Sequence, residues 1–182
     1  TFTRSLEEDL ARRDFTVNAM ALNLRGELRD PFGGRRDLEN GDLRCVGAPD
    51  RRFQEDAMRI LRGMRFSAAL GLDEEDETGR AIDRNRELLR EIAPERIQAE
   101  LTKLLCGRYA KEVLDNHPGV VGVFWPEALP MVGFDQRNIH HCYDVWNHST
   151  VALANTPPIP ELRCAALLHD IGKPAAFTLD ED

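Results

Sequence analysis

The stretch Glu55–Phe66, EDAMRILRGMRF, sets an acid and an arginine three residues apart at Asp56 and Arg59, and repeats arginine at Arg62 and Arg65. Residues three apart lie on one side of a helical turn, so a carboxylate acceptor and a guanidinium donor would stand side by side. The Watson–Crick edges of cytosine and adenine each present an amino donor beside a ring-nitrogen acceptor, whereas guanine and uracil have the opposite polarity. The pair could therefore select C and A without a nucleic-acid template, while Arg62 and Arg65 hold a triphosphate or fix the aspartate.

The same spacing also fits a solvent-exposed ion pair, which stabilises a helix by only a few tenths of a kcal/mol. Spacing alone therefore leaves a base-reading pair and a solvated helix face both open.

The segment ARRDFTVNAMAL offers a second group of polar side chains, at the start of a stretch that alternates inward and outward. Arg12 and Arg13 are suited to phosphate, and Asp14 and Asn18 could hydrogen-bond a ribose hydroxyl. Each of these residues alone is a weak signal.

The elements that must position these residues form a small mixed part followed by helices. Residues 5–13 have helical composition, FTVNAMALNL and GELRDPF flank a turn as a β-hairpin, GGRRDLENG predicts a short helix, and DLRCVG predicts a short strand. From Pro49 onward the periodicity is helical: FQEDAMRILRGMRFSAAL predicts one amphipathic helix, LDEED a turn, and residues 118–140 a connector with short turns. The predicted fold class is mainly α with a small α+β N-terminal piece.

Composition is that of an ordinary globular chain with an uneven charge. The net charge of the 182 residues is −8, but residues 1–65 carry 13 Lys+Arg and 12 Asp+Glu, a net charge of +1, and the remainder carries −9. The sequence has no apolar run near the length of a membrane span. Its four cysteines form no CxxC pair, which favours a reducing cytoplasm over a disulfide framework or a thiolate zinc site.

Four motifs in order give a specific resemblance. The patterns RRDFTxNA at Arg12–Ala19, DPFGGxxDL at Asp30–Leu38, EDxxRxLRxxRF at Glu55–Phe66 and ERIxxELxKLL at Glu95–Leu105 resemble class II tRNA nucleotidyltransferases (CCA-adding enzymes) and bacterial poly(A) polymerases. The resemblance runs almost without gaps over residues 8–105 and continues more loosely beyond them.

The resemblance implies a palm-type head, a helical neck that reads the incoming base, and a helical body for the tRNA acceptor end. It implies that Asp56 and Arg59 bond the base of CTP or ATP, and that Arg13, Arg62 and Arg65 contact the nucleotide. It implies nucleotide contacts less directly for Arg12, Asp14 and Asn18. The partners it implies are tRNA, CTP and ATP, with no membrane and no deducible protein partner.

One departure concerns the metal. The family carries a GGxVRD segment and a DxD strand, whose carboxylates hold Mg²⁺ for phosphoryl transfer, upstream of the RRD segment. This chain begins eleven residues before Arg12. No catalytic residue is therefore assigned here, and the expectation is a fragment that keeps nucleotide recognition but does not polymerise by itself.

A further group of residues, in HHCYDVWNHS and ALLHDIGKP, resembles the HD superfamily. His148 and the His169–Asp170 doublet would bind a divalent metal for phosphoester hydrolysis, and Lys173 could face phosphate. Because such helices also occur in nucleotidyltransferases with a vestigial metal site, a working site and a structural remnant both stay open.

The predicted organisation is residues 1–48 as the end of the head, 49–117 as the neck with base recognition and RNA binding, and 118–182 as a connector and the start of an HD-like domain. The predicted function is transfer of C and A from CTP and ATP to tRNA 3′ ends. The alternatives are a poly(A) polymerase or A-adding enzyme, an HD-type phosphohydrolase, and a catalytically silent RNA-binding fragment.

Overall fold

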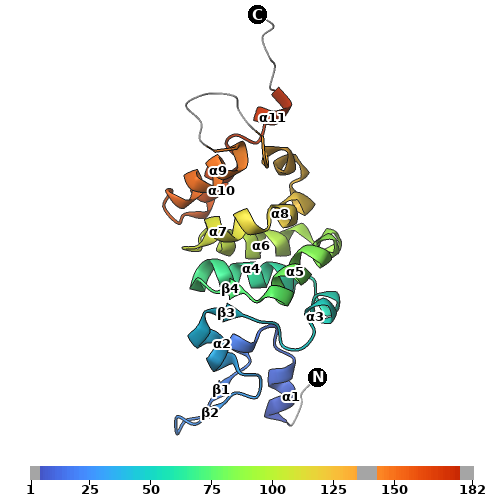
Figure 1. The fold of residues 1–182 in the computed structure, drawn as a ribbon, viewed down its shortest axis with the longest axis vertical. Coiled ribbons are helices and arrows are strands. Elements are labelled where there is room, and N and C mark those ends of the chain that lie inside the picture. Colours follow the sequence, from blue (N-terminus) through green and yellow to red (C-terminus); the bar gives the residue numbers. More distant parts are fainter. Residues whose placement is uncertain (1–4, 135–142, 177–182) are drawn as a thin grey trace, which may run out of the picture.

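The computed structural model describes residues 5–134 and 143–176. Its elements in chain order are α1 (Leu6–Ala11), η1 (Thr16–Asn18), β1 (Ala21–Leu22), β2 (Leu28–Arg29), α2 (Gly34–Asn40), β3 (Asp42–Leu43), α3 (Pro49–Glu55), α4 (Met58–Leu70), β4 (Asp73–Glu74), α5 (Asp76–Asn85), η2 (Arg86–Glu91), α6 (Pro94–Leu105), α7 (Ala110–Asn116), α8 (Pro118–Phe124), η3 (Pro126–Met131), α9 (Val145–Ala154), α10 (Pro160–Leu168) and α11 (Lys173–Ala176). Figure 1 shows an elongated molecule whose elements follow one another along the long axis, from the β1–β2 hairpin at one end to α11 at the other.

The N-terminal piece contains the hairpin and the short helix that the sequence predicts. Strands β1 and β2 pair antiparallel, and the side chain of Asn23 accepts backbone N–H bonds from Arg25 and Glu27 across the turn. Helix α2 lies between two glycines with left-handed backbone, Gly33 and Gly41, which residues with a Cβ rarely adopt. These local signals explain why the hairpin and α2 are correctly predicted. The strand predicted over FTVNAMALNL is shorter than expected, because Thr16–Asn18 form the 3₁₀ turn η1 and β1 covers only Ala21–Leu22.

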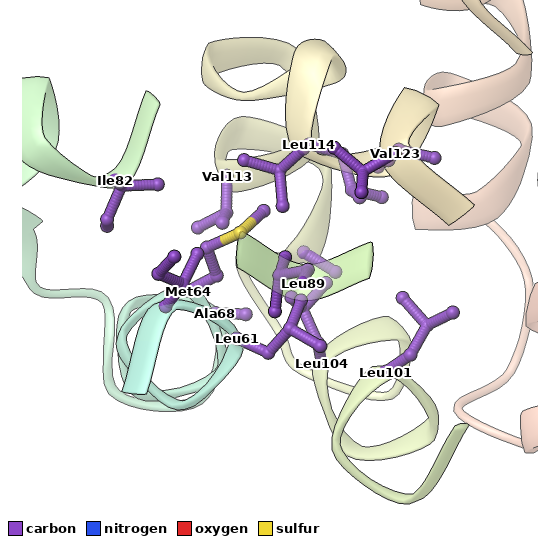
Figure 2. Close-up of a cluster of buried hydrophobic side chains, with 14 of the residues drawn as sticks. Leu61, Met64, Ala68, Ile82, Leu89, Leu101, Leu104, Val113, Leu114 and Val123 are labelled. Carbon is purple, nitrogen blue, oxygen red and sulfur yellow. The ribbon is translucent and has the colours of Figure 1, made fainter. Parts of the chain in front are cut away.

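The hydrophobic core runs through the stacked helices α4, α6 and α7. Figure 2 shows Leu61 and Met64 of α4 facing Leu104 of α6, with Leu114 of α7 above them. These four side chains are almost completely buried. Burying such a side chain contributes roughly 1.5–3 kcal/mol, so this core fixes how α4 and α6 lie against each other.

The single amphipathic helix predicted for FQEDAMRILRGMRFSAAL is wrong in one respect. Helix α3 ends at Glu55, and Asp56 has extended backbone (φ −156°, ψ 104°) before α4 begins at Met58. The Asp56 carboxylate accepts the backbone N–H of Met58 at 3.1 Å, a local bond that competes with continuation of the helix. Asp56 therefore lies in the break between two helices.

Two other predicted segments also differ. LDEED contains strand β4, which pairs parallel with β3 through the bonds Asp73 N–H to Gly41 O and Glu75 N–H to Leu43 O. The predicted connector contains helix α8 and the 3₁₀ turn η3, each opened by a proline at its first position. Proline is tolerated there because that N–H has no intrahelical partner.

The fold class predicted from sequence, mainly α with a small α+β N-terminal piece, is confirmed. Within the described ranges, no helix combines the length and apolarity needed to cross a bilayer.

Candidate nucleotide-binding site

The RRDFTVNA segment is fixed to the rest of the N-terminal piece through its backbone and one side chain. The N–H of Val46 donates to Asp14 O at 3.0 Å, and the N–H of Thr16 donates to Arg44 O at 2.9 Å. The hydroxyl of Thr16 donates to the buried carboxylate of Asp37 on α2 at 2.6 Å. The DPFGGRRDL motif therefore holds the RRDFTVNA motif in place.

A cavity of about 390 Å³ lies where this segment meets α4 and α6. Its lining residues are Arg12, Arg13, Asp14, Asp56, Met58, Arg59, Arg62, Arg96, Ala99 and Glu100. Six of the eight residues expected to contact nucleotide therefore share one cavity, although they come from segments more than 40 positions apart.

Asp14 is the buried anchor of this cavity, only 6% exposed. Its carboxylate accepts Arg62 Nε at 2.5 Å and Asn18 Nδ2 at 2.6 Å. Burial raises the pKa of Asp14, but the hydrogen bonds from Arg62 and Asn18 outweigh burial and hold that pKa below its ordinary value. Both oxygens are engaged, so the geometry favours an anchoring role for Asp14 and Asn18 over ribose contact.

The base-reading candidates Asp56 and Arg59 are held independently of each other. Arg59 Nη1 donates to Glu55 Oε2 at 3.0 Å and to Arg52 O at 2.9 Å, and its side chain is 16% exposed. Asp56 is 41% exposed, and its Oδ1 accepts the Met58 N–H. The ion pair of Arg59 in this structure is thus with Glu55.

This arrangement suits recognition of a polar edge. If Asp56 and Arg59 were paired with each other, a ligand would have to break that pair before using either group. Here a carboxylate acceptor and a guanidinium donor line the same cavity, each supported by a third group. The lowered pKa of Glu55, due first to its hydrogen bond from Arg59, keeps the supporting carboxylate charged.

The two arginines at the start of the motif are open to solvent. Arg12 and Arg13 are each 55% exposed, and both pair with Asp9, Arg13 at 3.6 Å. Exposed guanidinium groups at the rim of a cavity can make bidentate bonds to phosphate oxygens.

Arg65 and Asn18 do not line the cavity. Arg65 lies outside the cavity. The Nε atom of Arg65 is 3.1 Å from Glu100 Oε2, and the Arg65 guanidinium carbon is 4.5 Å from the Phe66 ring centroid. Arg65 therefore supports Glu100, which does line the cavity.

Sequence reasoning did not assign Arg96, Glu100 and Arg52 to the site. Arg96 Nη2 approaches Asp56 Oδ1 at 4.0 Å from α6, across the cavity. Arg96 and Glu100 stand four apart within ERIQAELTKLL, so their shared helix face was the available signal. Arg52 does not line the cavity but donates to the carbonyl oxygens of Arg12 and Arg13.

The HD-like residues also come together. One possible ligand atom from each of His148, His169 and Asp170 lies within 4.8 Å of the others. His169 Nδ1 is 2.8 Å from Ala166 O, which can only accept, so Nδ1 donates to it, and Nε2 faces Asp170 Oδ2 at 3.2 Å. Lys173 Nζ lies 2.7 Å from Asp170 Oδ2 and would compete with a cation for that oxygen.

A larger cavity of about 940 Å³ lies between η2, α6, α8 and α10. Its lining is mainly apolar and includes Ile97, Leu101, Phe124 and Trp125. None of the residues expected at the nucleotide site line it, so the smaller, arginine-rich cavity is the better candidate.

Comparison with known families agrees with the motifs. A family model described as the Poly A polymerase head domain matches residues 1–44. A second, described as the probable RNA and SrmB-binding site of polymerase A, matches residues 71–116.

Curated relatives match nearly two thirds of the chain. The CCA-adding enzyme of Ligilactobacillus salivarius (strain UCC118) is 50% identical over 115 residues, which cover 63% of this chain and 28% of that protein. The CCA-adding enzyme of Geobacillus kaustophilus (strain HTA426) is 48% identical over 114 residues, with the same two shares. The chain thus spans less than a third of the length of these relatives.

Solved structures extend the likeness to nearly the whole chain. The Bacillus stearothermophilus CCA-adding enzyme in complex with CTP aligns with a TM-score of 0.65 and 33% identity, over 95% of this chain and 47% of that one. A tRNA nucleotidyltransferase complexed with a primer tRNA and an incoming ATP analog aligns with a TM-score of 0.70 and 28% identity, over 93% of this chain and 52% of that one. By sequence and by fold, the chain is similar to CCA-adding enzymes and tRNA nucleotidyltransferases, and it matches two poly(A) polymerase family models over parts of its length.

Proposed function

We propose that this chain provides the base-reading part of a nucleotidyltransferase that adds C and A from CTP and ATP to tRNA 3′ ends without a nucleic-acid template. The observation that carries the proposal is a single cavity lined by a carboxylate, Asp56, and a guanidinium, Arg59, that are not paired with each other and lie beside the arginines of the RRD segment. The relatives solved with CTP, and with a primer tRNA and an ATP analog, support this assignment.

In the proposed mechanism, Asp56 accepts from the exocyclic amino group and Arg59 donates to the adjacent ring nitrogen, a polarity that only C and A present. Arg12 and Arg13 bind the phosphates, and Arg62, held by Asp14, lines the cavity beside them. The tRNA 3′ hydroxyl then attacks the α-phosphate, so that a phosphodiester bond forms while the bond to the β-phosphate breaks and pyrophosphate leaves.

Nucleotidyl transfer of this kind needs a divalent metal, for which we propose Mg²⁺ on the DxD carboxylates that the family carries ahead of the RRD segment. Among the described residues, the group with metal-ligand geometry is His148, His169 and Asp170, at the other end of the molecule. We assign the transfer metal to neither the cavity nor that group.

Substitution of Asp56 tests the base-reading proposal. In the full-length protein, Asp56→Ala should reduce the preference for CTP and ATP over UTP and GTP by roughly 10- to 100-fold, because one good bidentate pair is worth about 1–3 kcal/mol of discrimination. The measurement is single-nucleotide incorporation on a tRNA lacking CCA. Asp76→Ala, at a side chain 89% exposed on α5, is the matched control. Unchanged base choice in Asp56→Ala would contradict the proposal.

The same assay separates the members of the family. A CCA-adding enzyme incorporates from CTP and then ATP, whereas an A-adding enzyme or a poly(A) polymerase uses ATP alone. We favour CCA addition because the similar proteins of Ligilactobacillus salivarius and Geobacillus kaustophilus are CCA-adding enzymes.

Partners and location follow from the same proposal. The acceptor end of tRNA would bind over the helices matched by the RNA-binding model at residues 71–116. Because residues 66–182 carry a net charge of −9, that part alone should bind tRNA weakly, which a salt titration measures. Cysteine usage favours the cytoplasm, and the described Cys45, Cys106 and Cys164 are free thiols.

A second candidate activity, metal-dependent phosphoester hydrolysis, rests on the clustering of His148, His169 and Asp170. Two imidazoles and a carboxylate suit Mn²⁺ or Ni²⁺, and both histidines are accessible at 37% and 40% exposure. We expect stoichiometric Mn²⁺ binding that His169→Ala abolishes and Lys173→Ala strengthens, since the latter frees Asp170. Absence of stoichiometric binding in a calorimetric titration would remove this candidate.

A further inference from the structure

We propose that Arg52 is a positioning residue that couples the phosphate-binding arginines to the base-reading arginine. The inference rests on the proposed function and names a residue that the motifs do not assign. Arg52 lies on α3 and does not line the cavity.

The side chain of Arg52 bridges the RRD segment and the end of α3. Its Nη2 donates to the carbonyl oxygens of Arg12 at 2.8 Å and Arg13 at 2.5 Å, and its Nη1 donates to Glu55 Oε2 at 2.6 Å. The side chain is only 11% exposed. One guanidinium thus fixes the backbone of the RRD segment and a carboxylate at the end of α3.

The bonds continue from there to Arg59. Glu55 Oε2 and the carbonyl oxygen of Arg52 both accept from Arg59 Nη1, at 3.0 and 2.9 Å. Arg59 Nη2 also reaches the carbonyl of Arg12 at 3.4 Å. Arg12, Arg52, Glu55 and Arg59 therefore form a continuous set of hydrogen bonds from the phosphate side of the cavity to the base side.

The chemistry of the guanidinium suits this task. Arg12 is the C-terminal cap residue of α1, where helix carbonyls lack intrahelical partners and can accept from a side chain. A planar guanidinium can serve two carbonyls and a carboxylate at once in a fixed fork, whereas a lysine ammonium is a point charge without that geometry. The guanidinium of Arg52 therefore fixes the distance between the two recognition groups together with the direct bond from Arg59 to Arg12 O.

The neighbouring Arg51 provides a matched comparison. It lies on the same helix and also pairs with Glu55, through its Nε at 3.1 Å, but its side chain is 81% exposed. The bonds described for Arg51 reach Glu55 and do not extend to the RRD segment. A difference between the two arginines therefore reports on the bridge rather than on charge near Glu55.

The experiment compares Arg52→Lys, Arg52→Ala and Arg51→Ala in the full-length protein, with tRNA lacking CCA as primer. We expect both Arg52 variants to raise KM for CTP and ATP at least tenfold and to lower the preference for C and A over U and G at least fivefold. Arg51→Ala should change neither quantity by more than twofold. Thermal melting of each variant shows whether it is folded. If Arg52→Ala does not fold, the comparison of Arg52→Lys with Arg51→Ala tests the proposal.

A purely structural role for Arg52 would lower the melting temperature and the amount of active enzyme without changing base preference or KM. The proposal is overturned if the folded Arg52 variants keep base preference, or if they match Arg51→Ala. Asp56→Ala, measured in the same assay, distinguishes failure of the proposed function from failure of the role of Arg52. If Asp56→Ala keeps base choice, the proposed function fails; if it loses base choice while Arg52→Lys does not, only this inference fails.

Discussion

At the scale of single residues, the buried carboxylate of Asp14 decides how the site is held. It joins Arg62 of α4 to the head segment, and its exposure of 6% means that its charge must be compensated inside the protein. Arg62 is 37% exposed, so solvent screens the pair and reduces its contribution to stability.

Replacing Asp14 by Asn should lower the free energy of unfolding by about 1–3 kcal/mol at pH 7, because the amide cannot accept both donors and one buried hydrogen bond is lost. The folded-state pKa of Asp14 is lowered, so its contribution is present above its unfolded value of 3.8 and is lost as the pH falls through the folded value. Urea unfolding of wild type and variant should therefore differ at pH 7, and the difference should shrink as the pH falls below 3.8.

Asp76→Asn is the control for this measurement, since its carboxylate is 89% exposed and should leave stability nearly unchanged. A constant difference between wild type and Asp14→Asn from pH 7 to pH 3 would mean that the pair does not carry the effect.

At the scale of elements, the sequence reveals the parts that depend on local chemistry. Proline, glycine and asparagine at defined turn positions make the hairpin and α2 readable. The break at Asp56 could not be predicted from the sequence, because the apolar positions Phe53, Ala57 and Ile60 keep helical spacing across it. The interruption comes from a single side-chain hydrogen bond, from Met58 N–H to the Asp56 carboxylate.

The residues that α6 contributes to the site could not be predicted from the sequence either. Arg96 and Glu100 reach the cavity only because α6 packs against α4 through buried residues such as Leu61 and Leu104. A helical pattern predicts which face of α6 is apolar, but not which other helix that face will cover. Six of the expected residues converge because the family motifs already encode that tertiary arrangement.

The contact between α2 and η1 gives a prediction at this scale. A Cβ built on Gly34 would lie 2.0 Å from Thr16 O, a backbone atom that cannot move aside cheaply. Gly34→Ala should therefore separate α2 from the RRDFTVNA segment and lower the free energy of unfolding by about 1–3 kcal/mol or more. Thermal unfolding followed by circular dichroism measures the loss.

Gly79, inside helix α5, is the contrasting position, since a Cβ there would meet Glu74 Cβ at an ordinary 3.4 Å. Gly79→Ala should stabilise the protein by roughly 0.5–1 kcal/mol, as alanine is the better helix former. Equal effects of the two substitutions would show that close packing at Gly34 is not limiting.

At the scale of the whole molecule, the cavity lies at the junction of two electrostatically different parts. Residues 1–65 have a net charge of +1 and residues 66–182 a net charge of −9, yet five arginines line the cavity: Arg12, Arg13, Arg59, Arg62 and Arg96. A positive site on a negative molecule concentrates attraction for an anionic ligand at one place and disfavours nonspecific binding elsewhere.

Because the segment Arg12–Asp14, α4 and α6 all contribute to that cavity, a bound nucleotide should stabilise the N-terminal piece and the helical body together. A ligand present at one hundred times its Kd raises the free energy of unfolding by about 2.7 kcal/mol. We expect CTP and ATP to raise the melting temperature of the protein at concentrations where UTP and GTP do not, and Asp56→Ala to remove that difference. Inorganic triphosphate is the control for binding through phosphate alone. Equal stabilisation by all four nucleotides and by triphosphate would mean that the arginines bind phosphate while Asp56 and Arg59 read no base.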